Sequence, residues 1–138
     1  MGRILAIDYG TKRTGLAVTD PMRMIATALE TVETTVLMNY LKRYFEKEPV
    51  DEVVIGLPRR LDNTESETAP AVRKFIDTFR MVFKEKPIYT IDERFTSSLA
   101  QQAMIQGGMK KKDRQVKGNI DKISATLILQ DYLQMKSL

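Results

Sequence analysis

Residues 3–19, RILAIDYGTKRTGLAVT, decide how the chain begins to fold. Over Arg3–Tyr9 the apolar side chains alternate across both faces of an extended chain, and Asp8 shares one face with Ile4 and Ala6. A stretch that is apolar on both faces is typical of a strand buried inside a sheet. The turn residues that follow it, and then TGLAVT, predict a hairpin whose second strand runs back beside the first.

The remaining secondary structure follows from apolar periodicity, capping residues and turn residues. Three strands are followed by a helix–strand–helix–strand–helix–helix order, which predicts an α/β fold with a mixed five-stranded sheet flanked by helices. Because no repeat or linker interrupts the sequence, residues 1–138 are expected to form a single domain. The strands expected beyond the hairpin are Thr27–Val32, Asp51–Leu57 and Pro87–Asp92. The first two expected helices are Thr35–Lys47 and a helix that runs from the capping pair Thr64 and Glu67 to about Lys84. The last two are a helix from Thr96 or Ser97 to Gly107–Gly108, and Ile120–Gln134 behind a cap at Asn119.

The composition removes several kinds of chemistry. The 138 residues include no cysteine and no histidine, so disulfides, thiolate catalysis and imidazole bases are excluded. Any bound metal must be held by oxygen ligands, which suit Mg²⁺ or Mn²⁺. No apolar run is long enough to cross a bilayer, and the first residues lack the apolar region of a signal peptide. We therefore expect a cytoplasmic protein without membrane partners.

The excess positive charge is concentrated in one segment. The formal net charge is +4, and residues 110–122, KKKDRQVKGNIDK, hold six basic and two acidic side chains, which leaves sixteen of each sign elsewhere. Such a surplus is typical of a surface that binds a polyanion such as nucleic acid, although a solvated loop has the same composition. The basic residues expected to contact nucleic acid here are Lys110, Lys111, Lys112, Arg114 and Lys117.

Four acidic residues fall where an α/β sheet places its ligands. Asp8 ends the first strand, and Asp92 and Glu93 end a later one. Ligand sites of such sheets gather beyond the carboxyl ends of parallel strands. Because successive side chains of a strand face opposite sides, only one of Asp92 and Glu93 should join Asp8, and periodicity leaves that choice open. Asp121 is expected in the first turn of the last helix, on a face whose small residues would let the helix approach the sheet.

Converging carboxylates favour a divalent cation, because without one they repel and take up protons. Two such ions are suited to phosphodiester hydrolysis, a reaction that needs no histidine. Each acid also has a structural explanation: Asp8 as an Asx turn residue, Asp121 as a favourable charge near a helix start, and Glu93 as a surface ion-pair partner. The combination of these acids with a basic segment favours a metal-dependent nuclease.

Four segments, in order along the chain, carry a family resemblance. They are AIDYGTKRTGLAVTD, VVIGLP, TIDERFTS and KGNIDKISATLILQDYL, within a match that runs from Ile4 to Tyr132. Each motif is weak alone, but together they resemble the YqgF/RuvX-like family, whose members are described as Holliday junction resolvases or pre-16S ribosomal RNA nucleases. The resemblance implies a ribonuclease H-like fold with a three-carboxylate metal site.

Matched position by position, the resemblance implies that Asp8, Glu93 and Asp121 are the catalytic residues and hold Mg²⁺ or Mn²⁺. The family motif thereby indicates that Glu93, and not Asp92, is the acid that joins Asp8. Arg94 matches the arginine of the DER motif, where it would contact either the neighbouring glutamate or nucleic acid.

The resemblance also implies basic contacts near the first strand. Lys12 and Arg13 match a basic pair that is expected to contact phosphate. After GLP the chain departs from the family, because RRLDNTESE stands where a glycine-containing loop is common. Asn63 can adopt left-handed geometry there, so we expect a similar turn. Arg59 and Arg60 then become candidates for backbone contacts that confer affinity without reading sequence.

Two other functions agree with parts of the sequence. IDYGT resembles the phosphate-binding hairpin of actin-like phosphotransferases, but those proteins use two such domains and this chain supplies one. A non-catalytic factor acting on RNA or transcription would use the basic segment but would gain nothing from clustered acids. The substrate stays open between branched DNA and a ribosomal RNA precursor, with RNA slightly preferred, and a symmetrical junction would require a homodimer. No organic cofactor is implied.

Overall fold

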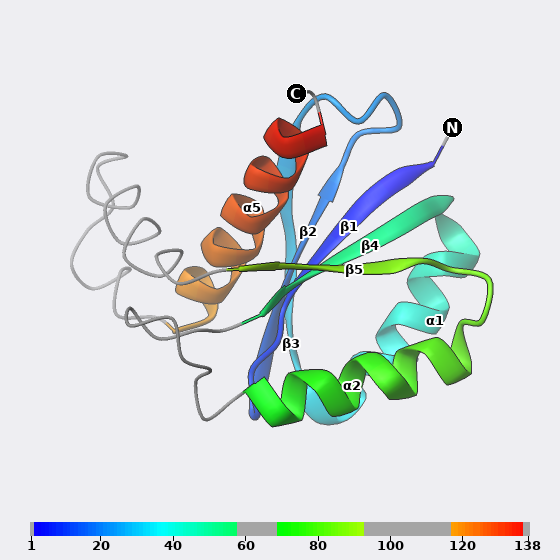
Figure 1. Ribbon diagram of the computed structural model, residues 1–138. Coiled ribbons are helices and arrows are strands. Elements are labelled where there is room, and N and C mark those ends of the chain that lie inside the picture. Colours follow the sequence, from blue (N-terminus) through cyan, green and yellow to red (C-terminus); the bar gives the residue numbers. More distant parts are fainter. Residues whose placement is uncertain (1, 58–68, 93–116, 137–138) are drawn as a thin grey trace.

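The computed structural model of the chain describes residues 2–57, 69–92 and 117–136, and gives the backbone alone at residues 92 and 117–123. Its centre is a five-stranded mixed sheet in the order β3-β2-β1-β4-β5 (Figure 1). The elements are the strands β1 (Arg3–Asp8), β2 (Arg13–Thr19), β3 (Ala26–Glu33), β4 (Val50–Leu57) and β5 (Ile88–Asp92), a 3-10 turn at Thr34–Val36, and the helices α1 (Leu37–Lys47), α2 (Ala69–Val82) and α5 (Lys117–Lys136).

β1 lies in the middle of the sheet and joins its two halves. It pairs antiparallel with β2, where Leu5 lies opposite Val18, and parallel with β4, where Leu5 lies beside Val53. β3 extends the antiparallel half and β5 extends the parallel half. This topology confirms the predicted hairpin-led mixed sheet. It also places the carboxyl ends of β1, β4 and β5 at one edge of the sheet.

One face of the sheet packs on α1 and α2. Leu5 and Ile7 of β1 are fully buried on this face, since alternate residues of a strand project to the same side. Phe79 of α2 is the largest fully buried side chain, and its ring lies 4.8 Å from that of Phe83 between centroids. This apolar layer supports the sheet from one side.

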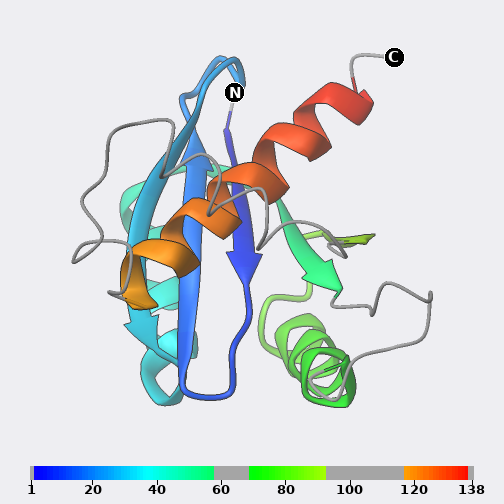
Figure 2. The same cartoon turned by 90° about the vertical axis from the view of Figure 1, so that its left-hand side faces the viewer.

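The opposite face is crossed by α5, which packs mainly on β1, β2 and β3 (Figure 2). Alanines contribute from both sides of this contact, Ala6 from β1 and Ala125 from α5, so that the helix can lie close to the sheet. This confirms that the helix presents small residues to the sheet. The buried residues of this layer are Ile4, Ala6, Ala17, Val54, Ala125, Ile128 and Leu129.

Most predicted elements are confirmed within one or two residues, and the last helix is the main correction. It was expected to begin at Ile120 behind a cap at Asn119, but α5 begins at Lys117, so the predicted cap is wrong. Asp121 accordingly lies in the second turn of the helix and not in the first. A cap residue contributes only about 1 kcal/mol, so a residue of the cap type is a weak signal of where a helix begins.

Several predicted features lie outside the described residues. These are the capping pair Thr64 and Glu67 and the helix from Thr96 or Ser97 to Gly107–Gly108. The α-helix predicted from Thr35 is preceded by the 3-10 turn and begins at Leu37. None of the described helices is long and apolar enough to cross a membrane.

Candidate active site

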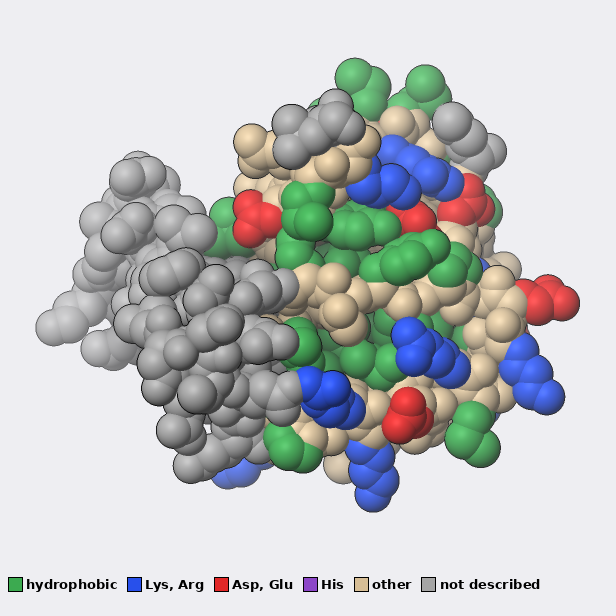
Figure 3. All heavy atoms as spheres, in the orientation of Figure 1, with side chains coloured by type: hydrophobic (Ala, Val, Ile, Leu, Met, Phe, Trp, Pro, Cys, Tyr) green, Lys and Arg blue, Asp and Glu red, His purple; other side chains and the backbone are tan. Residues whose placement is uncertain are grey.

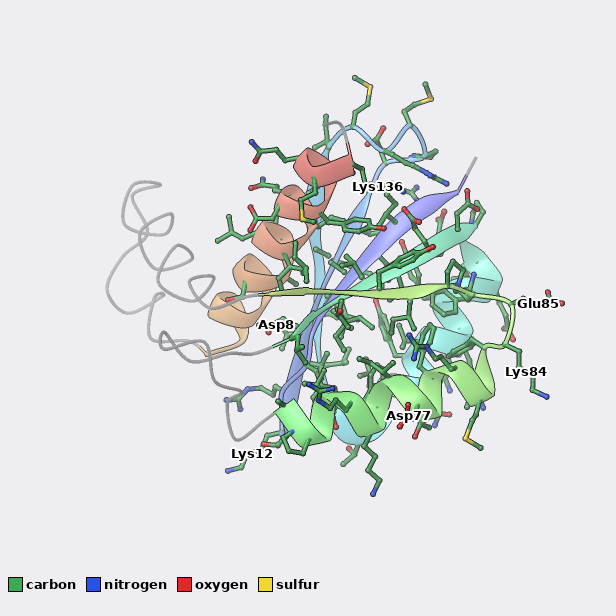
Figure 4. The ribbon with its side chains drawn as sticks, in the orientation of Figure 1. Asp8, Lys12, Asp77, Lys84, Glu85 and Lys136 are labelled. Carbon is green, nitrogen blue, oxygen red and sulfur yellow. The ribbon has the colours of Figure 1, made fainter. Side chains whose placement is uncertain are left out.

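Asp8 is the last residue of β1, at the edge where the parallel strands end. Its neighbours two and four residues earlier, Ala6 and Ile4, belong to the layer under α5. Because side chains alternate along a strand, Asp8 lies on this same face of the sheet. It is half-buried, and Figure 4 shows it on the side of the molecule where α5 begins and β5 ends.

The face of each β5 residue is fixed by its contacts. Ile88 packs in the layer of α1 and α2, whereas Ile91 packs in the layer under α5. Tyr89 contacts Tyr132 of α5, so Tyr89 and Ile91 share the face of Asp8. The pairing of Gly56 with Ile91, together with the register of β1 on β4, sets Asp8, Gly56 and Ile91 in one row across the sheet.

Of the three predicted catalytic acids, the structure describes the side chain of Asp8 alone. Glu93 lies outside the described residues, and Asp121 is described only as a backbone position in α5. Among the side chains that are described, no three acidic residues form a metal-binding group. Asp8 does have an interaction partner within the structure.

The turn between β1 and β2 carries the predicted phosphate contacts Lys12 and Arg13. Lys12 is exposed at the tip of the hairpin (Figure 4). Arg13, the next residue, is half-buried. The turn is held at defined points: the hydroxyl of Thr34 donates to the Gly10 carbonyl at 2.6 Å, and the Thr34 backbone N–H donates to the Lys12 carbonyl at 2.9 Å. A Cβ at Gly10 would collide with the Arg13 carbonyl oxygen, so only glycine fits there.

The remaining predicted nucleic-acid contacts lie at the start of α5 or outside the described residues. Lys117 is described by its backbone, at the start of α5. The residues outside the described part of the chain are Arg59, Arg60, Arg94, Lys110, Lys111, Lys112 and Arg114.

The structure adds two arginines that the sequence analysis missed. Arg73 and Arg80 of α2 line a hollow of about 330 Å³ together with Leu57 and Thr90, near the ends of β4 and β5. Asp77 lies between the two arginines on the helix (Figure 4). The signal in the sequence is their spacing of seven residues, two helical turns on one exposed face. These arginines lie on the sheet face opposite Asp8.

A larger hollow, of about 600 Å³, lies at the other end of the sheet and includes Val50 and Lys86. Burial lowers the pKa of Lys86, whose Nζ donates to the Val50 carbonyl at 2.5 Å and lies 4.5 Å from the centre of the Phe45 ring. Because this amine is engaged in packing and is far from Asp8 along the strands, the hollow is not a candidate for the chemistry.

Aromatic side chains extend the face of Asp8 along β5. The Tyr89 and Tyr132 rings are stacked, with centroids 6.2 Å apart and planes at 23°. The Lys136 amine lies 2.6 Å from the Glu52 carboxylate and 5.4 Å from the centre of the Tyr132 ring. Burial and the negative charge of the neighbouring Glu52 raise the pKa of Tyr132 to about 12, so its hydroxyl stays neutral.

Solved structures with the same fold include RuvC. A Thermus thermophilus RuvC in complex with a Holliday junction substrate superposes with a TM-score of 0.58 at 18% identity, over 98% of this chain and 96% of that one. A second Thermus thermophilus RuvC structure gives a TM-score of 0.53 at 16% identity, over 97% and 96%. At these identities the likeness establishes the fold, and the fold is ribonuclease H-like, as predicted.

Sequence comparison narrows this class to one family. The family model described as "RuvX: Holliday junction resolvase" matches residues 2–135, so the chain belongs to the RuvX family. A "Putative pre-16S rRNA nuclease" of Phocaeicola vulgatus is 52% identical over 99% of this chain and 98% of its own length. One of the same name from Christiangramia forsetii is 51% identical over 96% and 98%. The family confirms the predicted nuclease class over the binding-factor and phosphotransferase alternatives.

Proposed function

We propose that this chain hydrolyses phosphodiester bonds of structured RNA at a metal site formed by Asp8, Glu93 and Asp121. The observation that carries the proposal is the placement of Asp8, at the carboxyl end of the central strand and on the face crossed by α5. Glu93 and Asp121 must lie on this same face of the sheet if they bind the same metal ions as Asp8.

The alternation of β5 supports Glu93 over Asp92. Tyr89 and Ile91 lie on the face of Asp8, and the next position of that alternating series is residue 93. Position 92 instead belongs to the even-numbered positions of β5, together with Ile88, which packs toward α1 and α2. The sequence alone could not make this choice.

The buried stripe of α5 supports Asp121. Ser124, Ala125 and Ile128 are buried against the sheet, and position 121 precedes Ala125 by four residues, about one helical turn. A residue one turn before a buried position belongs to the same face of the helix. This spacing supports Asp121 as the acid that α5 contributes to the proposed site.

The donor set fits a hard divalent cation. The three acids offer carboxylate oxygens, the ligands that Mg²⁺ and Mn²⁺ prefer, and the chain has no histidine or cysteine that would select a softer metal. When bound, such ions lower the pKa of coordinated water and stabilise charge at the leaving oxygen. In this scheme Asp8 anchors the ion from a rigid strand, and Lys12 and Arg13 hold a flanking phosphate from the Thr34-braced turn.

We take a precursor of 16S ribosomal RNA as the substrate, met in the cytoplasm. Relatives of about half identity over nearly their whole length carry that name, whereas the junction-bound RuvC shares only 18% identity. A four-way DNA junction is the second candidate, because RuvC with this fold is bound to one. Its symmetry would call for a twofold homodimer, so the mass of the protein during cleavage separates the two substrates.

The test is cleavage of both substrates by the wild type and by Asp8→Asn, each with Mn²⁺ and with EDTA. We expect wild-type cleavage of the RNA precursor that requires Mn²⁺ and falls by at least about 1,000-fold in Asp8→Asn. Asp131→Asn is the matched control, since Asp131 is exposed on α5, and it should cleave like the wild type. Cleavage that survives in Asp8→Asn, or in EDTA, would show that the site is wrong.

A further inference from the structure

The α5 side of β5 carries an exposed aromatic surface beside the proposed site. α5 crosses the sheet over β1, β2 and β3, and Tyr89 of β5 remains 45% exposed at the border of the helix. Figure 3 shows hydrophobic side chains gathered in this band between α5 and β5. An exposed ring on a rigid strand is a suitable surface for stacking.

The Tyr89 ring is held in position by its neighbours. It lies stacked on Tyr132, whose ring lies 5.4 Å from the Lys136 amine. Glu52 is itself buried and ion-paired with Lys136 at 2.6 Å. The Tyr89 ring and the ion-paired Lys136 amine both lie against the Tyr132 ring, so a ligand that stacks on Tyr89 meets a surface that is already ordered.

This aromatic pair lies on the same face as Asp8 and close to it. Ile91 of β5 lies in the same row across the sheet as Asp8 of β1, with β4 between them. Tyr89 lies two residues before Ile91 and on the same face. From Asp8, the Tyr89 position is therefore displaced by about 10 Å across the sheet and by about 7 Å along the strand direction. A nucleic-acid strand that passes Asp8 can therefore reach Tyr89 within a few nucleotides.

We propose that Tyr89, supported by Tyr132, is a stacking platform for an unpaired base of a single-stranded flank of the substrate. This inference rests on the nuclease function proposed above and names a second contact for the same substrate. Stacking on aromatic side chains is the usual way in which proteins hold unpaired bases, and it tolerates any base sequence.

The local charges favour a base over a phosphate as the ligand. Lys136 is paired with Glu52, and nearby Arg23 is paired with Asp51, so these two basic groups are already neutralised in the part of the chain that the structure describes. What remains available is the face of the ring. The platform should therefore add affinity that depends on an unpaired base and changes little with salt.

Binding experiments test the platform separately from cleavage. In an Asp8→Asn background, affinity is measured for an RNA duplex with a single-stranded tail that contains 2-aminopurine, and for the same duplex with blunt ends. Tyr89→Ala should weaken binding of the tailed RNA by about 5- to 150-fold and abolish quenching of the 2-aminopurine, while blunt-duplex affinity stays unchanged. Tyr89→Phe should bind like the parent, and Tyr89→Leu should behave like Tyr89→Ala.

The matched control is a second stacked pair on the opposite face. Tyr40 and Tyr44 of α1 have ring centroids 6.3 Å apart at 8°, and Tyr40→Ala should leave tailed-RNA affinity unchanged. Unchanged affinity in both Tyr89→Ala and Tyr89→Leu would overturn the platform, as would an equal loss on the blunt duplex. Neither result depends on Asp8, whereas cleavage that survives Asp8→Asn would overturn only the proposed catalytic site.

Discussion

The Lys136 amine, in the last turn of α5, lies 2.6 Å from the carboxylate of Glu52 in β4. The pair fastens the end of α5 to the parallel half of the sheet, while the buried stripe of the helix holds its middle. Since a helix is a stiff element, fastening one end also orients the other. The other end is where Asp121 must be positioned for the proposed chemistry.

Removal of this ion pair should lower stability by a modest amount. Lys136 is partly exposed, so Lys136→Met is expected to reduce the free energy of unfolding by about 1 kcal/mol. Glu52→Gln should have a similar effect, and the double variant should cost less than the sum because both remove one interaction. Denaturant unfolding measures these values. Lys84→Met, at an exposed position, serves as the control, and an equal loss there would deny the pair a specific role.

Enlarging Ala125 should separate α5 from the sheet. Its side chain is fully buried against the layer that contains Ala6, so Ala125→Leu is expected to cost about 1–3 kcal/mol through overpacking. If Asp121 acts from this helix, cleavage should fall by roughly 100-fold, more than the stability loss explains. Gln130→Leu, at an exposed position of the same helix, should change neither quantity. Full activity in a folded Ala125→Leu protein would contradict the role given to α5.

Divalent ions should stabilise the wild type but not Asp8→Asn. A ligand that binds only the folded state at 100 times its dissociation constant adds about 2.7 kcal/mol to the free energy of unfolding. We therefore expect Mn²⁺ to raise the melting temperature of the wild type and of Asp131→Asn, and to leave Asp8→Asn unchanged. In EDTA, Asp8→Asn should be at least as stable as the wild type, because clustered carboxylates repel. An identical Mn²⁺ shift in Asp8→Asn would place the ion elsewhere.

Acid should weaken the tip of the β2–β3 hairpin through Asp20. Backbone N–H groups of Ile25 and Met24 donate to its carboxylate and hold the pKa of Asp20 below its usual value of 3.8. A carboxyl whose folded pKa is lowered stabilises the fold above its unfolded pKa, and this contribution is lost as pH falls through the folded pKa. Asp20→Ala should therefore melt below the wild type at neutral pH.

The difference between Asp20→Ala and the wild type should shrink as pH falls below about 4, where the carboxyl begins to take up a proton. Melting temperatures measured across acidic and neutral pH test this. Asp20→Asn keeps one acceptor oxygen and should fall between the two proteins at neutral pH. A constant difference between Asp20→Ala and the wild type at every pH would show that the carboxylate charge has no role in the turn.

Much of the fold could be predicted from the local pattern of apolar and polar residues. The two apolar faces of Arg3–Asp8 predicted a central strand, and the sheet does bury that strand on both sides. The predicted start of α5 was wrong because Asn119 has the side chain of a typical cap, whereas it lies inside a helix that runs from Lys117, and a cap contributes only about 1 kcal/mol. Arg73, Arg80 and the Tyr89 platform were missed because their significance depends on neighbours that are distant in the chain.

The sequence by itself determined the chemistry available to this protein: oxygen ligands only, a basic segment, and acids at the ends of strands. The tertiary structure decided which side of the sheet α5 covers, and with it the face shared by Asp8, Tyr89 and Ile91. The physical reason is that β1 is apolar on both faces. Periodicity shows which residues of such a strand share a face, but not which face a given helix covers. Only the packing of α5 onto one face distinguishes the two.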